Sequence, residues 1–156
     1  MIMDAIMKII FMIMASIAIW YAPAKAQVVK WTYSAKKIGD KKYEVRLHAE
    51  IDEEWHIYSQ NTPKGGPLPT TVSFNKNALV SLDGKVKEEG KMIFYHDEVF
   101  DVDVYAYKDS VDFVQVVKLK SNAKTKVSGT VAFMACTKER CLTPEKKEWS
   151  VLVGGG

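Results

Sequence analysis

Two cysteines, Cys136 and Cys141, are the only thiol side chains among the 156 residues of this sequence, and four residues separate them. A disulfide requires Cα atoms roughly 4.4–6.8 Å apart, whereas five steps of extended strand at ~3.3 Å each span far more. The chain must therefore turn between the two cysteines, and the polar run over residues 138–140 is compatible with a tight turn. Such a pair can be a structural bridge, a redox-active dithiol or part of a metal site, and the spacing alone does not choose among them.

As a structural cross-link this pair would contribute little stability. The chain-entropy estimate is ~2 kcal/mol for so short a loop, against ~4.7 kcal/mol for a loop of 100 residues. A domain of this length can bury most of its surface without a cross-link. A small exposed ring is also open to an attacking thiolate, and such exchange passes through a mixed disulfide. These arguments favour redox chemistry, although structural bridges are common in exported proteins.

Metal and nucleic-acid binding find little support. Two cysteines exclude a four-cysteine zinc or iron–sulfur site within one chain. His48, His56 and His96 lie far apart, and no ligand spacing links them to the cysteines. We predict neither a metal nor another cofactor. With 22 basic against 19 acidic residues, the charge is too balanced to indicate a nucleic-acid partner.

The first 26 residues have the pattern of a targeting segment. Lys8 precedes an apolar run over residues 9–21, and Ala24-Lys25-Ala26 fits the small-x-small cleavage pattern. The run of 13 residues is short against the ~20 that span a bilayer. We therefore predict a cleaved signal peptide over residues 1–26 and a mature domain over residues 27–156. Export would place that domain in a periplasm or outside the cell, where disulfides persist.

The segments that must position the cysteines are predicted to be strands. Residues 42–51 alternate strictly between apolar and polar side chains, which indicates a strand with one buried face. Residues 100–107 and 127–135 alternate in the same way, and the second run leads directly into Cys136. Further strands are expected over residues 28–34, 70–74, 91–95, 111–119 and 148–153. No window holds a sustained helical period.

Short strands separated by turn signals predict an antiparallel sandwich or barrel. The expected turns are Gly39-Asp40, Asp83-Gly84, Glu89-Gly90, Lys108-Asp109 and Ser121-Asn122. The longest irregular stretch covers residues 59–69 and contains three prolines, which cannot donate to a central ladder. It either shapes a surface or simply crosses between the sheets.

Three segments of the sequence together resemble a known protein family. They are ACTKERCLTPE (residues 135–145), EWHIYS (54–59) before the proline-rich stretch, and YHDEVF (95–100). In this order they resemble the amino-terminal periplasmic domain of the thiol–disulfide interchange protein DsbD, over roughly residues 30–153. The resemblance implies an all-β fold, an immunoglobulin-like antiparallel β-sandwich.

The resemblance also implies a protein-disulfide reductase activity. Such a domain takes electrons from a thioredoxin-like reductant and passes them to oxidised periplasmic thiol proteins, among them disulfide isomerases and cytochrome c maturation proteins. The resemblance assigns the mixed disulfide with a partner to Cys141 and the resolving role to Cys136. The membrane conduit and thioredoxin-like domain of the family member are missing here. We therefore expect a stand-alone version or a fragment, linked to the membrane only through a separate electron conduit.

A cap over the cysteines is the last feature that the resemblance implies. The capping aromatic falls on Phe100, with Val99 as the alternative by register. Asp97 and Glu98 match an acidic pair, and carboxylates near a thiol raise its pKa and so slow indiscriminate attack. Tyr58 matches an aromatic beside the disulfide. Core packing is the plain alternative for Phe100 and Tyr58, and a solvated turn is the plain alternative for the acidic pair.

A second hypothesis is a non-catalytic β-sandwich binding module with a structural disulfide. It would use the loop over residues 59–69 and the surface aromatics Tyr105 and Tyr107 to hold a protein or a ligand. It predicts that replacing both cysteines leaves binding intact.

Overall fold

The computed structural model describes residues 27–155, so the predicted signal peptide lies outside the described residues. Within them the chain forms strands and no helix, and therefore no helix long and apolar enough to cross a membrane. The strands are β1 (Val29–Gly39), β2 (Lys42–Ile51), β3 (His56–Tyr58), β4 (Thr71–Phe74), β5 (Val80–Asp97), β6 (Val102–Leu119), β7 (Thr125–Phe133), β8 (Ala135–Cys136) and β9 (Glu145–Val153).

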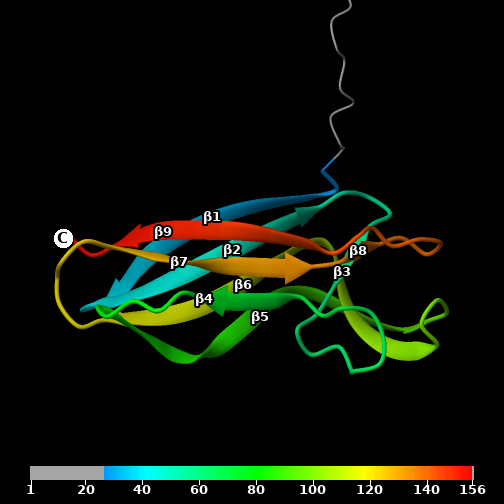
Figure 1. Ribbon diagram of the computed structural model, residues 1–156, viewed down its shortest axis with the longest axis horizontal. Helices are drawn as coiled ribbons and strands as arrows, with labels where there is room; N and C mark the ends of the chain where they lie inside the picture. Colours follow the sequence, from blue (N-terminus) through cyan, green and yellow to red (C-terminus); the bar gives the residue numbers. More distant parts are fainter. Residues whose placement is uncertain (1–26, 156) are drawn as a thin grey trace, which may run out of the picture.

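Two antiparallel sheets make up the molecule (Figure 1). The larger sheet has the order β1-β2-β6-β3-β8, with β5 also paired to β6, and the smaller sheet has the order β4-β7-β9. The strict alternation in β2 is confirmed, because the side chains of Tyr43 and every second residue to Ile51 are buried. The immunoglobulin-like antiparallel β-sandwich expected from the sequence is the fold that the chain adopts.

The core between the sheets is built on aromatic side chains. The ring of Trp31 on β1 lies 5.8 Å from Phe113 on β6 and 5.3 Å from Phe133 on β7, measured between centroids. Trp149 on β9 contacts Phe74 on β4 edge-on, with the centroids 4.9 Å apart. Such pairs add to the large apolar area that each ring removes from water. Trp31 and its two partners therefore connect one sheet to the other.

Three of the predicted turns are wrong. Asp83-Gly84 and Glu89-Gly90 lie inside β5, at or beside shifts in its register with β6, and Lys108-Asp109 lies inside β6. Gly84 and Asp109 do have positive φ, at 78° and 62°. A bulge uses the same left-handed residues as a turn, so the local signal was real but the chain continues in the same direction.

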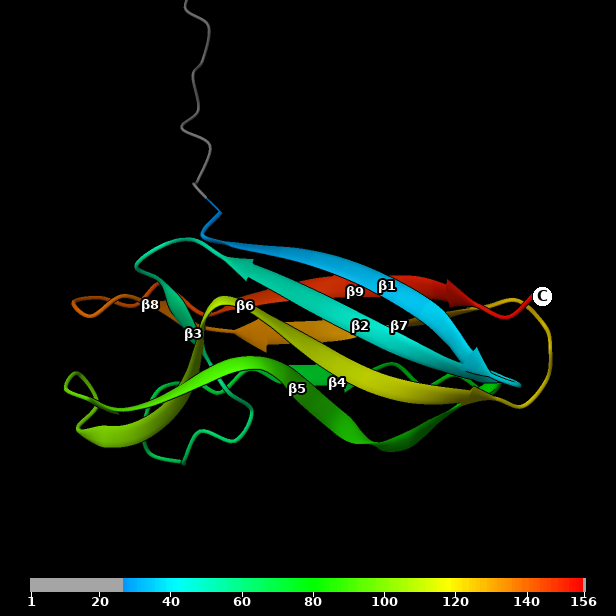
Figure 2. The same cartoon turned by 180° about the vertical axis from the view of Figure 1, so that it is seen from behind.

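The long strand β6 changes partners at Lys108-Asp109. Residues 110–118 pair with β2, whereas residues 106–107 pair with β3. The β5–β6 hairpin therefore extends past the end of β2 and reaches the short strands β3 and β8. Figure 2 shows the closed end of this hairpin, the loop between β3 and β4 and the segment after β8 at the same end of the sandwich.

Candidate functional site

A disulfide joins Cys136 and Cys141, with an S–S distance of 2.06 Å and Cα atoms 4.0 Å apart. The predicted turn between them is confirmed: the Thr137 amide donates to the Arg140 carbonyl at 2.8 Å. The two cysteines face each other as an isolated antiparallel bridge, flanked by that bond and by the Leu142 amide donating to Ala135. Opposed residues of this non-hydrogen-bonded kind have the closest Cα atoms in a sheet, which accounts for the short separation.

The two sulfur-bearing residues differ in exposure. Cys136 closes β8 between β3 on one side and Cys141 on the other, and only 1% of it is exposed. Cys141 lies beyond it and is half-buried. A thiolate that approaches from solvent therefore meets Cys141 first, as exchange by attack on one particular sulfur requires.

A small apolar cluster surrounds the pair, separate from the main core. Its buried members are Tyr58, Val104, Ala106, Met134 and Cys136, and Phe100 and Cys141 are half-buried against it. Residues 98–101 form the turn between β5 and β6, so this turn brings Phe100 to the cluster that contains Cys136. Val99, the alternative by register, points away and is 57% exposed. The structure thus brings Tyr58 and Phe100 together with the disulfide.

Asp97 holds this turn in place. The Tyr58 hydroxyl donates to its Oδ2 at 2.9 Å, and the amides of Val99 and Phe100 donate to its Oδ1 at 3.0 and 3.3 Å. Both Tyr58 and Asp97 are buried, and burial followed by the Asp97 hydrogen bond raises the pKa of Tyr58 far above its usual range. One carboxylate therefore connects the aromatic beside the cysteines to the backbone that carries Phe100.

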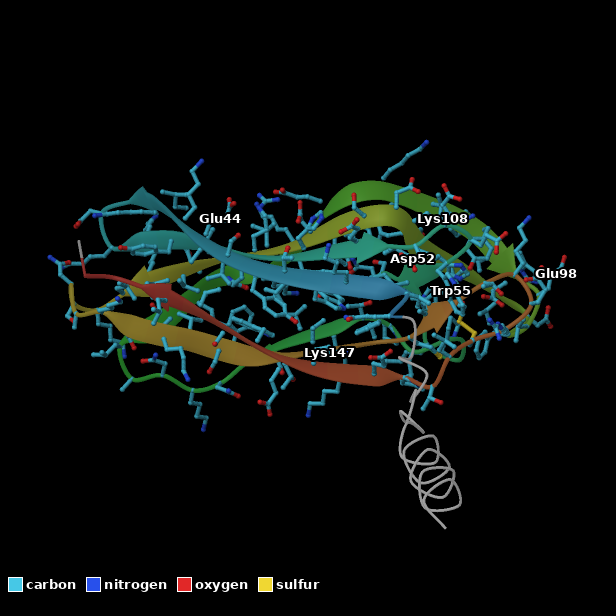
Figure 3. The ribbon with its side chains drawn as sticks, turned by 90° about the horizontal axis from the view of Figure 1, so that it is seen from above. Glu44, Asp52, Trp55, Glu98, Lys108 and Lys147 are labelled. Carbon is cyan, nitrogen blue, oxygen red and sulfur yellow. A yellow bond between two sulfur atoms is a disulfide. The ribbon has the colours of Figure 1, made fainter. Side chains whose placement is uncertain are left out.

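Glu98, the second acidic residue, is exposed and lies on the rim of a cavity of about 410 Å³. The cavity lies between the β5–β6 hairpin and the cysteine turn, since Tyr95 and Lys108 line one side and Thr137 and Lys138 the other. Figure 3 shows Glu98 and Trp55 at the end of the molecule that carries the disulfide, far from Glu44.

His56 is a functional candidate that the sequence analysis did not place at the site. It is 4% exposed, and it is the cross-strand partner of Cys136 in the β3–β8 pair. Its Nε2 lies 2.7 Å from the Tyr95 hydroxyl and 3.1 Å from the Tyr58 hydroxyl. Burial, assisted by the charge of Lys108, lowers the pKa of His56 to about 4. Its spacing of two from Tyr58 was the available signal, because residues two apart on a strand share a face.

Two further contacts correct or extend the expectations. The guanidinium of Arg140 lies 5.5 Å from the ring centroid of Trp55, a cation–π contact that ties the cysteine turn to the residue before β3. Tyr107, expected at the surface, is 3% exposed, and its hydroxyl donates to Glu88 at 3.1 Å. It is buried because β6 changes partner just after it, which places two consecutive residues inside.

Within residues 27–155, no group of three or more His, Cys, Asp or Glu side chains is arranged to hold a metal ion. Two of the histidines have carboxylate partners instead. His48 Nδ1 lies 2.7 Å from Asp112, and the His96 ring nitrogens lie 3.2 Å from Asp101 and 3.0 Å from Asp103.

Comparison with known proteins gives one family and a set of distant structures. The family described as "Thiol:disulfide interchange protein DsbD, N-terminal" matches residues 23–152. No curated protein sequence matches the chain. The N-terminal periplasmic domain of ScsB from Proteus mirabilis is similar at 14% identity, with a TM-score of 0.51. The alignment covers 81% of this chain but 45% of that one, so the chain spans less than half of its length.

Two more solved structures are less similar. The yeast GGA1 GAE domain is 10% identical with a TM-score of 0.46, over 83% of this chain and 96% of that one. The N-terminal domain of DsbD from Neisseria meningitidis, in its reduced form, is 13% identical with a TM-score of 0.39, over 80% and 86%.

Proposed function

Because the chain belongs to the family of DsbD N-terminal domains, we propose that it is an exported thiol–disulfide exchange domain that relays reducing equivalents through Cys136 and Cys141. The observation that carries this proposal is the unequal exposure of the two joined cysteines. A bridge with one sulfur presented at the end of the sandwich and the other buried behind it has a defined point of attack. A purely structural bridge has no need of this asymmetry.

The reaction follows from that geometry. A thiolate of a thioredoxin-like reductant attacks Sγ of Cys141, the Cys136–Cys141 bond breaks, and Cys136 leaves as a thiolate that takes up a proton. The reductant's second thiol then displaces Cys141 and leaves the dithiol on this domain. In the onward transfer the Cys141 thiolate attacks the disulfide of an oxidised partner, and Cys136 resolves the mixed disulfide.

The surrounding residues would control access and reactivity. Phe100 would act as the cap that shields the pair until a partner docks, with Val99 beside it on the same turn. Tyr58 would pack in the buried cluster on the side of Cys136 that faces away from solvent. Asp97 and Glu98 would disfavour the thiolate by their charge, which raises the pKa of a nearby thiol. Asp97 supports the cap directly as well, through its hydrogen bonds to the turn.

The partners and location follow from the same proposal. Residues 1–26 would be removed after export, and the domain of residues 27–156 would work in the periplasm as a protein-disulfide reductase. Its reductant would be a thioredoxin-like protein or domain, itself reduced through a separate membrane conduit. Oxidised periplasmic thiol proteins, including those of cytochrome c maturation, would receive the electrons.

Mixed-disulfide trapping tests the proposal. The Cys136→Ala variant retains only Cys141, which can be charged with an aromatic thiol and offered to a thioredoxin that lacks its resolving cysteine. We expect a stable covalent complex on a non-reducing gel. The Cys141→Ala variant, charged at Cys136 in the same way, is the matched control and should form none. Equal trapping by both variants, or by neither, contradicts the proposed roles.

The reduction potential separates this function from the binding-module alternative. Structural disulfides have potentials below about −300 mV, so a redox-active pair should equilibrate at a higher value in dithiothreitol or glutathione buffers. A potential in the structural range, with no exchange with any thioredoxin-like protein tested, would instead support a structural bridge.

A further inference from the structure

His56 is a buried titratable side chain for which the reaction described above has no use. It lies directly opposite Cys136 in the antiparallel β3–β8 pair. Opposed residues of such a pair project from the same face, with Cβ atoms about 4.5–5.5 Å apart. Tyr58, two residues along β3, lies on that face as well and belongs to the cluster around Cys136. The imidazole therefore projects from the same face of the sheet as the sulfur that must act from inside the protein.

Cys136 needs a neighbour that can accept its proton. The residue is 1% exposed among apolar side chains, and burial of this kind disfavours a thiolate. Yet Cys136 must lose its proton before it attacks and regain one after it leaves. The Asp97 carboxylate already accepts hydrogen bonds from Tyr58 and from two backbone amides. Glu98 is exposed at the outer rim of the cavity.

We propose that His56 is the general base of the exchange, which takes the proton from Cys136 when that sulfur attacks the mixed disulfide. This role rests on the proposed function, because it assigns a group to the resolving step of that reaction.

The step balances as follows. His56 Nε2 contacts the Tyr58 and Tyr95 hydroxyls, so the neutral imidazole accepts the Cys136 thiol proton at Nδ1. The resulting thiolate attacks Sγ of Cys141 in the mixed disulfide. The Cys136–Cys141 bond forms, the bond from Cys141 to the partner sulfur breaks, and the partner leaves as a thiolate. The imidazolium then gives its proton to that thiolate or to water. The domain's dithiol is oxidised by two electrons, and the partner's disulfide is reduced by the same two.

The charge that forms on Cys136 decides whether His56 can accept a proton. Beside the intact disulfide, burial lowers the pKa of His56 to about 4, so the ring is neutral at neutral pH but a weak base. A thiolate that forms opposite the ring favours its charged form and raises that pKa, which lets the ring take the proton as Cys136 attacks. The titratable groups that surround His56 are Tyr58 on β3, Tyr95 and Asp97 on β5, Lys108 on β6 and Cys136 on β8. The 410 Å³ cavity that His56 helps to line is also bordered by the exposed side chains of His96, Glu98 and Lys138. It gives the proton a route to solvent.

The two cysteine steps can be timed separately with dithiobisnitrobenzoate, a small aromatic disulfide whose thiolate product absorbs visible light. Attack by Cys141 of the reduced protein releases one thiolate, and attack by Cys136 on the resulting mixed disulfide releases the second. In His56→Gln we expect the first phase to be unchanged. The second phase should slow on the order of 100-fold at neutral pH, the usual size of general base catalysis. Its rate should also rise in proportion to hydroxide, whereas the wild-type rate stays nearly level across neutral pH.

Chemical rescue and a matched histidine provide the controls. In His56→Ala, imidazole added to the buffer can enter the cavity and should restore the second phase in proportion to its concentration. His48→Gln is the same substitution on the solvent face of β2, and it should leave both phases unchanged. An unchanged second phase in His56→Gln overturns the inference. So does a slowing that is equal at every pH and is not rescued, because that pattern means that His56 only positions its neighbours. The failure of the proposed function would appear separately, in the trapping experiment with thioredoxin.

Discussion

The hydrogen bond between Tyr58 and Asp97 offers a direct test of how the turn over the cysteines is held. Tyr58→Phe removes the donor with little change in shape, and Asp97→Asn replaces the acceptor with an amide of the same size. The double variant closes a thermodynamic cycle that isolates the interaction between the two side chains. All four proteins should be compared in the oxidised state, so that the disulfide is constant.

The structure sets the size of the effect. The bond is 2.9 Å long, and both residues are buried, at 0% and 6% exposed. A hydrogen bond to a charged group contributes about 1.5–3 kcal/mol, and its loss leaves the remaining partner without compensation. We therefore expect each single substitution to lower the free energy of unfolding by about 2 kcal/mol. The double variant should lose little more than either single one, which gives a coupling energy of about 1.5 kcal/mol or more.

Urea unfolding measures the stabilities, and the rate of disulfide reduction by dithiothreitol measures access to the cysteines. If the loss of ~2 kcal/mol falls on the turn that carries Phe100, the opened turn becomes about 30-fold more populated, and reduction should accelerate by up to that factor. If the two single-variant losses sum to the loss of the double variant within about 0.5 kcal/mol, the coupling between Tyr58 and Asp97 is refuted. A coupled loss without faster reduction would refute the idea that this turn shields the disulfide.

Three further predictions address burial and packing. Burial lowers the pKa of His56 to about 4, so the unfolded chain, which titrates near 6.5, binds the proton first. The free energy of unfolding should therefore be steady above pH ~6.5 and fall by up to ~3 kcal/mol as the pH drops towards ~4. Urea melts of His56→Gln should lack that loss. If the free energies of unfolding of the wild type and the variant fall in parallel with pH, the reasoning is contradicted. In Gly129→Ala the new Cβ would overlap the Ser73 carbonyl oxygen on β4, so unfolding should become easier by about 1–3 kcal/mol, and an unchanged Tm would show that the strands can separate at no cost. Phe100→Ala should speed reduction of the disulfide by dithiothreitol, whereas Val99→Ala should not. Equal reduction rates in the two variants would exclude Phe100 as the cap.

Much of the fold could be predicted because each sheet has one buried face and one solvent-facing face. Residues 42–51 were predicted as a strand with the bounds that the structure has, since five inward side chains repeat at every second position. The expected strands over 91–95 and 111–119 were only fragments of 18-residue strands. Gly and Asp support both turns and bulges. The pairing of β5 with β6 decides between them in β5, and the pairing of β6 with both β2 and β3 decides between them in β6. Both pairings are tertiary information.

The members of the candidate site could be proposed from the sequence more readily than their connections. The cysteine spacing pointed to Cys136 and Cys141, and the family resemblance pointed to Tyr58, Asp97 and Phe100. The structure brings these residues to one end of the sandwich. The sequence could not indicate that one carboxylate joins Tyr58 to the backbone of the turn. That contact crosses 39 residues of sequence, and β3 and β5 are not paired with each other directly.

The unequal exposure of the two cysteines is a property of the sheet rather than of the loop. β8 is only two residues long, yet Cys136 has a neighbour on each side, His56 on β3 and Cys141 across the bridge. Cys141 has no such strand beyond it in the described order, so it occupies the edge position. Edge residues of a sheet are the ones that another molecule can reach. The four-residue turn fixes Cys141 opposite Cys136, and the fold thereby determines which sulfur an incoming thiolate meets.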